Sequence, residues 1–219
     1  DCLTIACPVG IAANGYSSSP FLLYGEHAQE LALRAIITSF TDAMAELLLF
    51  LKESFKGIAF DYVPSAAAYT CVLTDAYKSA ESLSVDIASD RTEFFTVRNG
   101  VIDTLMSFEH PPIQEREEEM RNSAEVWKAR FLSTLDSIFH TGVLPGDIYL
   151  FGDASRVIAP YLAESSWISG FSHEKKARIR AVSGSHIFGG ESFNGFLRGC
   201  ADARLASLLF YAVKHVPLF

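Results

Sequence analysis

The clearest alternation of apolar and polar positions lies in residues 83–108. Residues 83–87 read Leu-Ser-Val-Asp-Ile, and a second run rich in apolar residues follows at positions 92–97. A period of two indicates β-strands, whose successive side chains point to opposite faces. The dipeptide Asn99-Gly100 then predicts a two-residue hairpin turn, because both residues tolerate positive φ. A third strand over residues 101–108 completes a predicted three-stranded antiparallel meander.

Beyond this meander the pattern alternates between helical and strand periods. Apolar residues recur every three or four positions over residues 120–138, which predicts a long helix. Short strands are expected at residues 147–151 and 179–182, separated by a helix over residues 154–165. A last helix is expected to begin at Asn194. Strands that are joined through a helix should run parallel to their neighbours, so the sequence predicts an α/β fold with a mixed sheet.

The first part of the chain follows a different order. Residues 2–9 are β-prone, and from residue 26 to residue 55 apolar side chains recur every three or four positions. That spacing predicts one long helix with a single apolar stripe, ended by Gly57. A short buried strand over residues 58–63 and a helix capped by Ser65 are expected to follow.

Composition sets limits on the function. The chain has 219 residues, of which 49% are hydrophobic, and this fraction excludes a disordered protein. It carries 18 Lys and Arg residues against 26 Asp and Glu residues, a net charge of −8. This acidic balance argues against a nucleic-acid-binding surface and against direct contact with an anionic membrane.

Cysteine and hydropathy patterns favour a cytoplasmic location. No cysteine pair has a C-x-x-C spacing, and all four lie in apolar stretches: Cys2, Cys7, Cys71 and Cys200. We interpret them as buried free thiols in a reducing compartment. The longest apolar stretch, residues 47–51, is far shorter than the roughly 20 residues that a membrane-spanning helix needs.

Two motifs add a family resemblance. The order of elements over residues 83–214 is that of a ribonuclease-H-like unit, the lobe that is duplicated in actin-like proteins. Residues 85–92, Val-Asp-Ile-Ala-Ser-Asp-Arg-Thr, resemble the second phosphate-binding turn of actin-like ATPases, with its pattern hydrophobic-Asp-hydrophobic-Gly-Gly-Gly-Thr-Thr. Residues 150–155, Leu-Phe-Gly-Asp-Ala-Ser, resemble their adenosine motif, hydrophobic-x-Gly-Gly-Gly-Ala. Residues 14–16 and 63–68 are also similar to the bacterial branch that contains the cell-division protein FtsA and the pilus-assembly protein PilM.

The resemblance implies a domain organisation. Residues 81–219 would form the second actin-like lobe, in which a three-stranded meander, two parallel strands and helices are combined. Residues 1–80 would be the C-terminal part of the first lobe. The first phosphate loop of the family, an Asp-x-Gly hairpin, has no counterpart in this sequence, so the resemblance is to a divergent member that lacks the N-terminal part of the first lobe.

The resemblance also implies a site for ATP and Mg²⁺. Asp86, at a strand end, would hold Mg²⁺ beside the phosphates, usually through water. Backbone N–H groups of the turn would contact phosphate, and the second motif would contact the base and ribose. The predicted site residues are Asp86, Ala88, Ser89, Asp90, Arg91, Thr92, Gly152, Asp153, Ala154 and Ser155.

Both motifs depart from the family pattern. Ala88, Ser89 and Asp90 stand at the three glycine positions of the first turn, and Asp90 puts a carboxylate where phosphate charge would lie. Arg91 could offset that charge. Asp153, a good helix N-cap, and Ala154 replace two further glycines. Two interpretations stay open: retained nucleotide binding, or turns with a structural role alone.

The sequence therefore predicts an actin-like assembly or scaffold protein, of the cell-division or type IV pilus-assembly type. It would act through protein partners or self-association, with weak or lost ATP binding and no efficient catalysis. Pro217 interrupts the C-terminal residues, so no amphipathic membrane-binding tail is evident, and membranes would be reached through partners. The alternative is a kinase or other phosphotransferase of the same superfamily, which needs intact glycine-rich turns. A ribonuclease-H-like nuclease would need several converging carboxylates that the sequence does not show.

Overall fold

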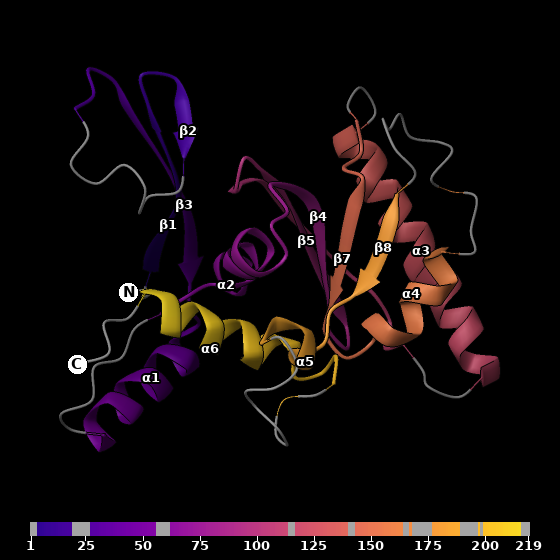
Figure 1. Ribbon diagram of the computed structural model, residues 1–219. Helices are drawn as coiled ribbons and strands as arrows, with labels where there is room; N and C mark the ends of the chain where they lie inside the picture. The colour runs from indigo at the N-terminus through magenta and orange to yellow at the C-terminus, as the bar shows by residue number, and fades with distance from the viewer. Residues whose placement is uncertain are drawn as a thin grey trace. The chain divides into compact units, whose positions relative to one another are not determined.

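The structure, a computed structural model, describes residues 4–18, 27–55, 62–113, 117–139, 143–163, 167, 177–188, 197 and 199–215. The chain divides into two compact units, Asp1–Ala67 and Ala68–Phe219 (Figure 1). Each unit is described by itself below. The assignment of residues 1–80 and 81–219 to pieces of two lobes stays a prediction.

The first unit contains a small antiparallel sheet and a helix. The sheet has the strand order β2-β1-β3, formed by β1 (Thr4–Ala13), β2 (Tyr16–Ser18) and β3 (Leu31–Ser39). Asn14 and Gly15 form the β1–β2 turn with φ values of 50° and 82°, as an Asn-Gly hairpin requires. The helix α1 (Asp42–Ser54) begins after Thr41, whose hydroxyl accepts a hydrogen bond from the Met44 N–H.

The prediction of one long helix over residues 26–55 is wrong. Residues 31–39 form β3, which pairs with β1 along its whole length, and only the second half of the predicted segment is helical. Leu33, Ile36 and Ile37 fit a helical stripe, but the segment is also rich in β-branched residues that favour a strand. The strand predicted over residues 58–63 lies mostly outside the described residues, and so does Gly57.

The second unit is built on a five-stranded mixed sheet of order β6-β5-β4-β7-β8. Its strands are β4 (Glu81–Ile87), β5 (Arg91–Arg98), β6 (Val101–Glu109), β7 (Asp147–Phe151) and β8 (Arg178–Ala181). The first three are antiparallel, whereas β7 runs parallel to both β4 and β8. Both the predicted meander and the predicted parallel strands are therefore confirmed.

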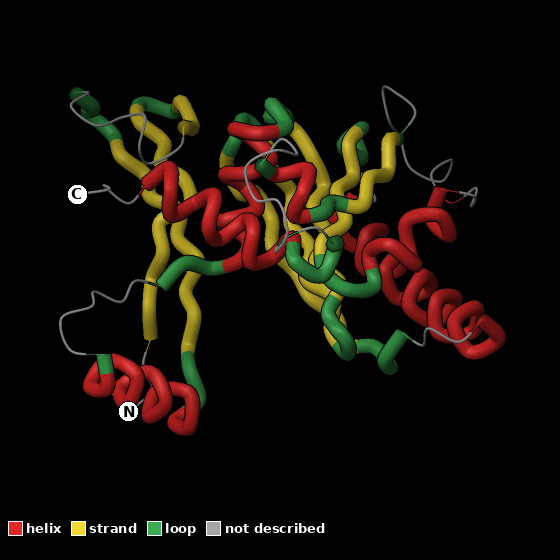
Figure 2. Tube along the Cα trace, turned by 60° about the horizontal axis from the view of Figure 1, so that its bottom comes forward, coloured by secondary structure: helices red, strands yellow, loops and turns green. Residues whose placement is uncertain are grey.

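Helices cover both faces of this sheet (Figures 1 and 2). On one face lie α2 (Ser65–Cys71), the π-helical segment η1 (Val72–Ala76) and α6 (Ala203–His215). On the other lie α3 (Glu117–Phe139) and α4 (Ser155–Ala163), while the short α5 (Gly184–Ile187) precedes α6 in the chain. The last helix was predicted to begin at Asn194, which lies outside the described residues.

The central strand β4 separates the two layers. Leu83, Val85 and Ile87 belong to a core cluster that includes Trp127 and Phe131 of α3. The alternate residues point to the opposite face, where Tyr69 of α2 stacks on Phe151, with ring centroids 4.1 Å apart. Both faces of β4 are therefore buried, as is usual for strands that pair in parallel at the centre of an α/β sheet.

Burial of the cysteines is confirmed for two of them. Cys7 and Cys71 are buried, whereas Cys200 is half-buried, and none of the three forms a disulfide bond. Cys2 lies outside the described residues. Within the described part of the chain, no helix has the length and apolar character needed to cross a membrane.

Candidate functional site

The sheet brings the first residues of the two predicted motifs together. Strands β4 and β7 pair in parallel with Asp86 opposite Phe151, so Gly152 follows directly beside the end of β4. Gly152 has a φ of +89° and passes very close to β4. A Cβ at this position would lie 2.3 Å from the carbonyl oxygen of Ile87 and 2.9 Å from Oδ1 of Asp86. The glycine is therefore required by the contact between the two strand ends.

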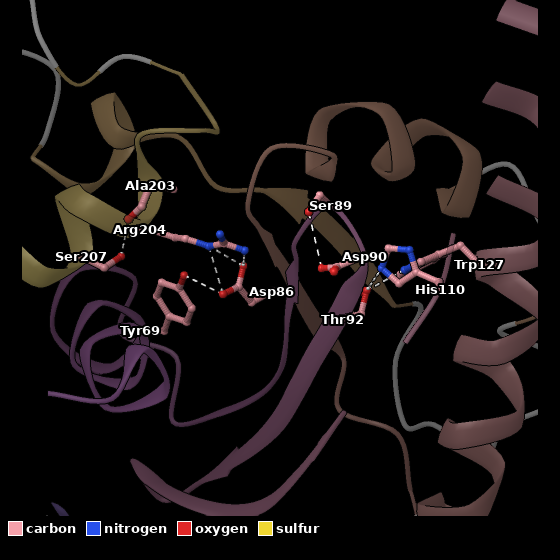
Figure 3. Close-up of polar contacts among 10 residues, drawn as sticks. All are labelled: Tyr69, Asp86, Ser89, Asp90, Thr92, His110, Trp127, Ala203, Arg204 and Ser207. Atoms are coloured by element: carbon pink, nitrogen blue, oxygen red, sulfur yellow. Dashed lines mark hydrogen bonds and ion pairs between the residues drawn. The ribbon is translucent and has the colours of Figure 1, made fainter. Parts of the chain in front are cut away.

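Asp86 is held by two side chains from distant parts of the chain. Arg204 of α6 donates to Oδ1 from Nη2 at 2.7 Å and from Nε at 3.0 Å, and its Nε lies 3.2 Å from Oδ2. The Tyr69 hydroxyl donates to Oδ2 at 3.0 Å. Figure 3 shows Arg204 and Tyr69 converging on this carboxylate. Only 8% of Asp86 is exposed, so both oxygens are satisfied by protein groups.

The charge states of the cluster are fixed by its surroundings. Burial raises the pKa of Tyr69, and the negative charge of Asp86 raises it further, so the phenol stays a neutral donor. Burial alone would lower the pKa of Arg204, but hydrogen bonds and the charge of Asp86 raise it on balance. The cluster is therefore a carboxylate paired with a guanidinium and supported by a hydroxyl.

This arrangement does not fit the Mg²⁺ role that the family resemblance implies for Asp86. Mg²⁺ takes oxygen ligands with strict octahedral geometry, and a carboxylate ligand must have an oxygen free for the ion or its water. Here the guanidinium of Arg204 already lies against both oxygens. Among the described residues there is also no group of three or more His, Cys, Asp or Glu side chains that could hold a metal ion.

The turn between β4 and β5 is closed by a hydrogen bond from the Ala88 N–H to the Arg91 carbonyl at 2.9 Å. Outside glycine, the described residues with positive φ are Asn14, Lys78 and Asn99, so no residue of this turn is left-handed. An anion-binding nest is built from alternating right- and left-handed residues. The turn in which the family's glycines are replaced therefore also lacks the backbone conformation of an anion-binding nest.

The charged side chains of this turn, Asp90 and Arg91, make separate contacts. Asp90 is exposed, and its Oδ1 accepts a hydrogen bond from Ser89. Arg91 pairs with Glu93 at 3.2 Å and donates to the Ser107 hydroxyl at 3.0 Å. Arg91, which could offset the charge of Asp90, forms its ion pair with Glu93 of the same strand.

Thr92 lies on the opposite face of the sheet from Asp86. It pairs with Ile87 and is fully buried. Its hydroxyl accepts from Nε1 of Trp127 at 2.8 Å and lies 3.0 Å from Nε2 of His110. Nδ1 of His110 lies 2.9 Å from the carbonyl oxygen of Pro111, which can only accept, so this ring nitrogen is a donor. The hydroxyl is thus engaged by a buried network on the α3 side (Figure 3).

The remaining residues of the second motif form the start of α4. Asp153 is exposed and Ala154 half-buried, and α4 begins at Ser155, which is fully buried. Ala154, rather than Asp153, immediately precedes the helix. The Ser155 N–H donates to the Gly152 carbonyl at 3.2 Å, so the motif works as a tight strand-to-helix turn.

A polar cavity of about 570 Å³ lies beside the first turn. It is lined by Asp90, Arg91, Glu109, His110, Pro111 and Arg130. Two carboxylates balance two arginines, and no residue of the second motif takes part. The structure therefore brings Asp86 and Gly152 together. Asp90 and Arg91 line a separate cavity, and the side chain of Thr92 is buried in the core.

Sequence reasoning missed Tyr69 and Arg204. They lie 17 and 118 residues from Asp86 in the chain. No local pattern connects them to the motif. Arg204 did not stand out as a residue of a first helical turn either, because the last helix was predicted to begin at Asn194 and begins at Ala203.

Comparison with solved structures identifies the architecture. The chain is similar to one in a structure described as a PilM–PilN type IV pilus biogenesis complex, with a TM-score of 0.56 and 15% sequence identity. That match covers 99% of this chain and 67% of the other. The fold is actin-like.

Two further solved structures are less similar to the chain. A Bacteroides thetaiotaomicron protein with an actin-like ATPase fold and unknown function gives a TM-score of 0.44 and 12% identity, covering 81% of this chain and 64% of the other. The Aquifex aeolicus member of the Ppx/GppA family gives 0.31 and 12%, covering 74% and 67%. No protein-family model and no curated protein sequence matches the chain.

Proposed function

We propose that this protein of actin-like fold is an assembly or scaffold protein of the pilus-assembly or cell-division type, with weak or lost ATP binding. It works through protein contacts, at the cytoplasmic face of a membrane that it reaches through partners. The observation that carries this proposal is the large exposed apolar surface of the first unit. The likeness to a chain from a PilM–PilN type IV pilus biogenesis complex supports a role in protein binding.

The first unit exposes an unusual amount of apolar side chain. Helix α1 has no buried residue, and Phe50 on it is 64% exposed. In the neighbouring strand β3, Ile37 is 68% exposed. The exposed large apolar residues of this unit are Tyr16, Leu31, Leu33, Ile37, Met44, Leu47, Leu49, Phe50 and Phe55. Exposed apolar side chains in such number on a short sheet and one helix are what a protein-binding surface would present.

Weak or lost ATP binding is supported by three features of the second unit. The turn after β4 lacks left-handed residues and carries the exposed carboxylate of Asp90. The Thr92 hydroxyl is held by Trp127 in the core. Asp86 is paired with Arg204. Each of these features takes away one contact that a nucleotide and its metal would use, so we expect ATP affinity to be low.

The proposal is tested by substitution on α1. Phe50→Asp should abolish capture of the partner protein in cells, measured by cross-linking and mass spectrometry, while leaving the circular dichroism spectrum unchanged. Val126→Asp is the matched control, because Val126 is a 44% exposed apolar residue on a helix of the second unit. Equal capture by wild type and Phe50→Asp would contradict the proposed binding surface.

Nucleotide binding is tested separately by calorimetric titration of the full chain with ATP and MgCl₂. We expect no binding in the micromolar range. Micromolar affinity together with phosphate transfer to a small acceptor would instead support the phosphotransferase alternative.

A further inference from the structure

Arg204 occupies an unfavourable place in its helix. It is the second residue of α6, whose first turn contains no acidic residue. The N-terminal end of a helix carries partial positive charge, so a cation there is destabilising unless an anion compensates for it. Asp202, directly before the helix, provides one negative charge there and accepts a hydrogen bond from the Gly199 N–H. The anion that contacts the guanidinium itself is Asp86, at 2.7 Å. Since Asp86 lies next to the last residue of β4, the pair joins the helix to the sheet.

The three side chains form a closed set. Asp86 receives hydrogen bonds from Arg204 on both oxygens and one from Tyr69 on Oδ2. The guanidinium cancels the charge of the carboxylate, and the tyrosine adds none. A divalent cation approaching Asp86 would have to displace the guanidinium of Arg204 or share the carboxylate with it. Two cations bound to one carboxylate lie within a few ångströms of each other and repel strongly.

We infer that Arg204 takes the place of a metal cation at Asp86, as a built-in counter-ion that keeps α6 on the sheet without metal or nucleotide. The actin-like fold implies a dication beside the carboxylate at this strand end; this chain supplies a fixed monovalent cation from its own last described helix instead. The inference does not depend on which protein partner the first unit binds.

The first test uses the unmodified chain. The melting temperature, Tm, should agree within about 1 °C between buffer with EDTA and buffer with excess MgCl₂, because a ligand that does not bind cannot stabilise the folded state. Titration with Mn²⁺, followed by the electron paramagnetic resonance signal of the free ion, should show no site that Asp86→Asn removes. A rise in Tm with Mg²⁺, or a Mn²⁺ site lost in Asp86→Asn, would overturn the inference.

The second test is a double-mutant cycle. Arg204→Gln should lower Tm by about 5 °C or more, because it leaves the buried Asp86 carboxylate unpaired. Asp86→Asn should also lower Tm, but by less, because the Arg204 side chain is 37% exposed and water can solvate it. The double variant should lose much less than the sum of the two, in EDTA and in MgCl₂ alike. Additive losses, or losses that appear only with Mg²⁺, would contradict an internal counter-ion.

A matched control is available in the same sheet. Arg178 and Asp147 join β8 to β7 by an ion pair of the same length, 2.7 Å, but the arginine side chain is 64% exposed. Arg178→Gln should change Tm little, because exposed ion pairs contribute little to stability. A loss in Arg178→Gln as large as that in Arg204→Gln would show that the counter-ion position has no special role.

Discussion

Trp127 donates a hydrogen bond from Nε1 to the hydroxyl of Thr92 at 2.8 Å, and both side chains are fully buried. The same hydroxyl lies 3.0 Å from Nε2 of His110. A threonine that the sequence motif assigns to phosphate thus connects β5 to α3 and to the segment after β6. Its role in this structure is to satisfy buried polar groups.

Thr92→Val should therefore destabilise the second unit. Valine keeps the shape but leaves the indole N–H of Trp127 and Nε2 of His110 without the Thr92 hydroxyl, a loss of about 1–3 kcal/mol in the free energy of unfolding. Urea denaturation followed by tryptophan fluorescence measures the change. Thr92→Ser, which keeps the hydroxyl, should retain most of the stability; equal stability of the valine and serine variants would contradict the network.

Gly152→Ala should be severely destabilising. The added Cβ would meet the Ile87 carbonyl at 2.3 Å, and alanine disfavours the φ of +89°. We expect a loss of about 3 kcal/mol or more, measured by thermal unfolding. Gly146→Ala is the control, because a Cβ there has no neighbour within 4 Å among the described atoms. Comparable stability of the two variants would show that the β4–β7 contact can relax.

Lys78→Gly should stabilise the protein. Lys78 is an exposed residue with a φ of 53° at the end of η1, a left-handed position that favours glycine. Relief of the strain outweighs the added freedom of the unfolded chain, for a gain of about 0.5–1 kcal/mol. The urea midpoint gives the measurement. Lys78→Ala keeps the Cβ and should leave stability nearly unchanged, so an equal gain in both variants would contradict this explanation.

Tyr77 should make the protein less stable at alkaline pH. Burial, together with the neighbouring Tyr149, raises the pKa of Tyr77 to about 12. The unfolded chain loses this proton near pH 10, whereas the folded chain holds it until about pH 12. The unfolded state therefore binds fewer protons in this window, and the free energy of unfolding falls as pH rises, by up to about 1.4 kcal/mol per pH unit.

Tyr77→Phe removes the ionisable group and should flatten this alkaline decline. The check is a series of urea denaturation curves between pH 9 and pH 12 for wild type and variant. Parallel curves for the two proteins would mean that the decline arises from other groups.

The fold of the second unit was predictable because its signals are local. The alternation in residues 83–87 and the Asn99-Gly100 turn identify the meander without reference to the rest of the chain. The strand β3 was mistaken for helix because its apolar spacing fits both periods. What decides between them is the pairing with β1, a contact between segments far apart in sequence.

The candidate site was predictable only in part. The neighbourhood of Asp86 and Gly152 follows from the parallel register of β4 and β7. The partner of Asp86 could not be inferred, because Arg204 arrives from a helix 118 residues away. The face on which Thr92 lies follows from strand alternation and its pairing with Ile87, once the register of the hairpin is known.

The π-helical segment η1 has a consequence for insertions and deletions. The Tyr77 N–H bonds to the carbonyl of Val72, five residues back, so the helix that begins as α2 contains a widened turn. Tyr69 before this turn stacks on Phe151, and Tyr77 after it contacts Tyr149 at a centroid distance of 5.1 Å. Deleting one residue between them would rotate one aromatic ring relative to the other by about 100°. The length of this segment, more than its composition, therefore places the rings of Tyr69 and Tyr77 against two residues of the same strand, β7.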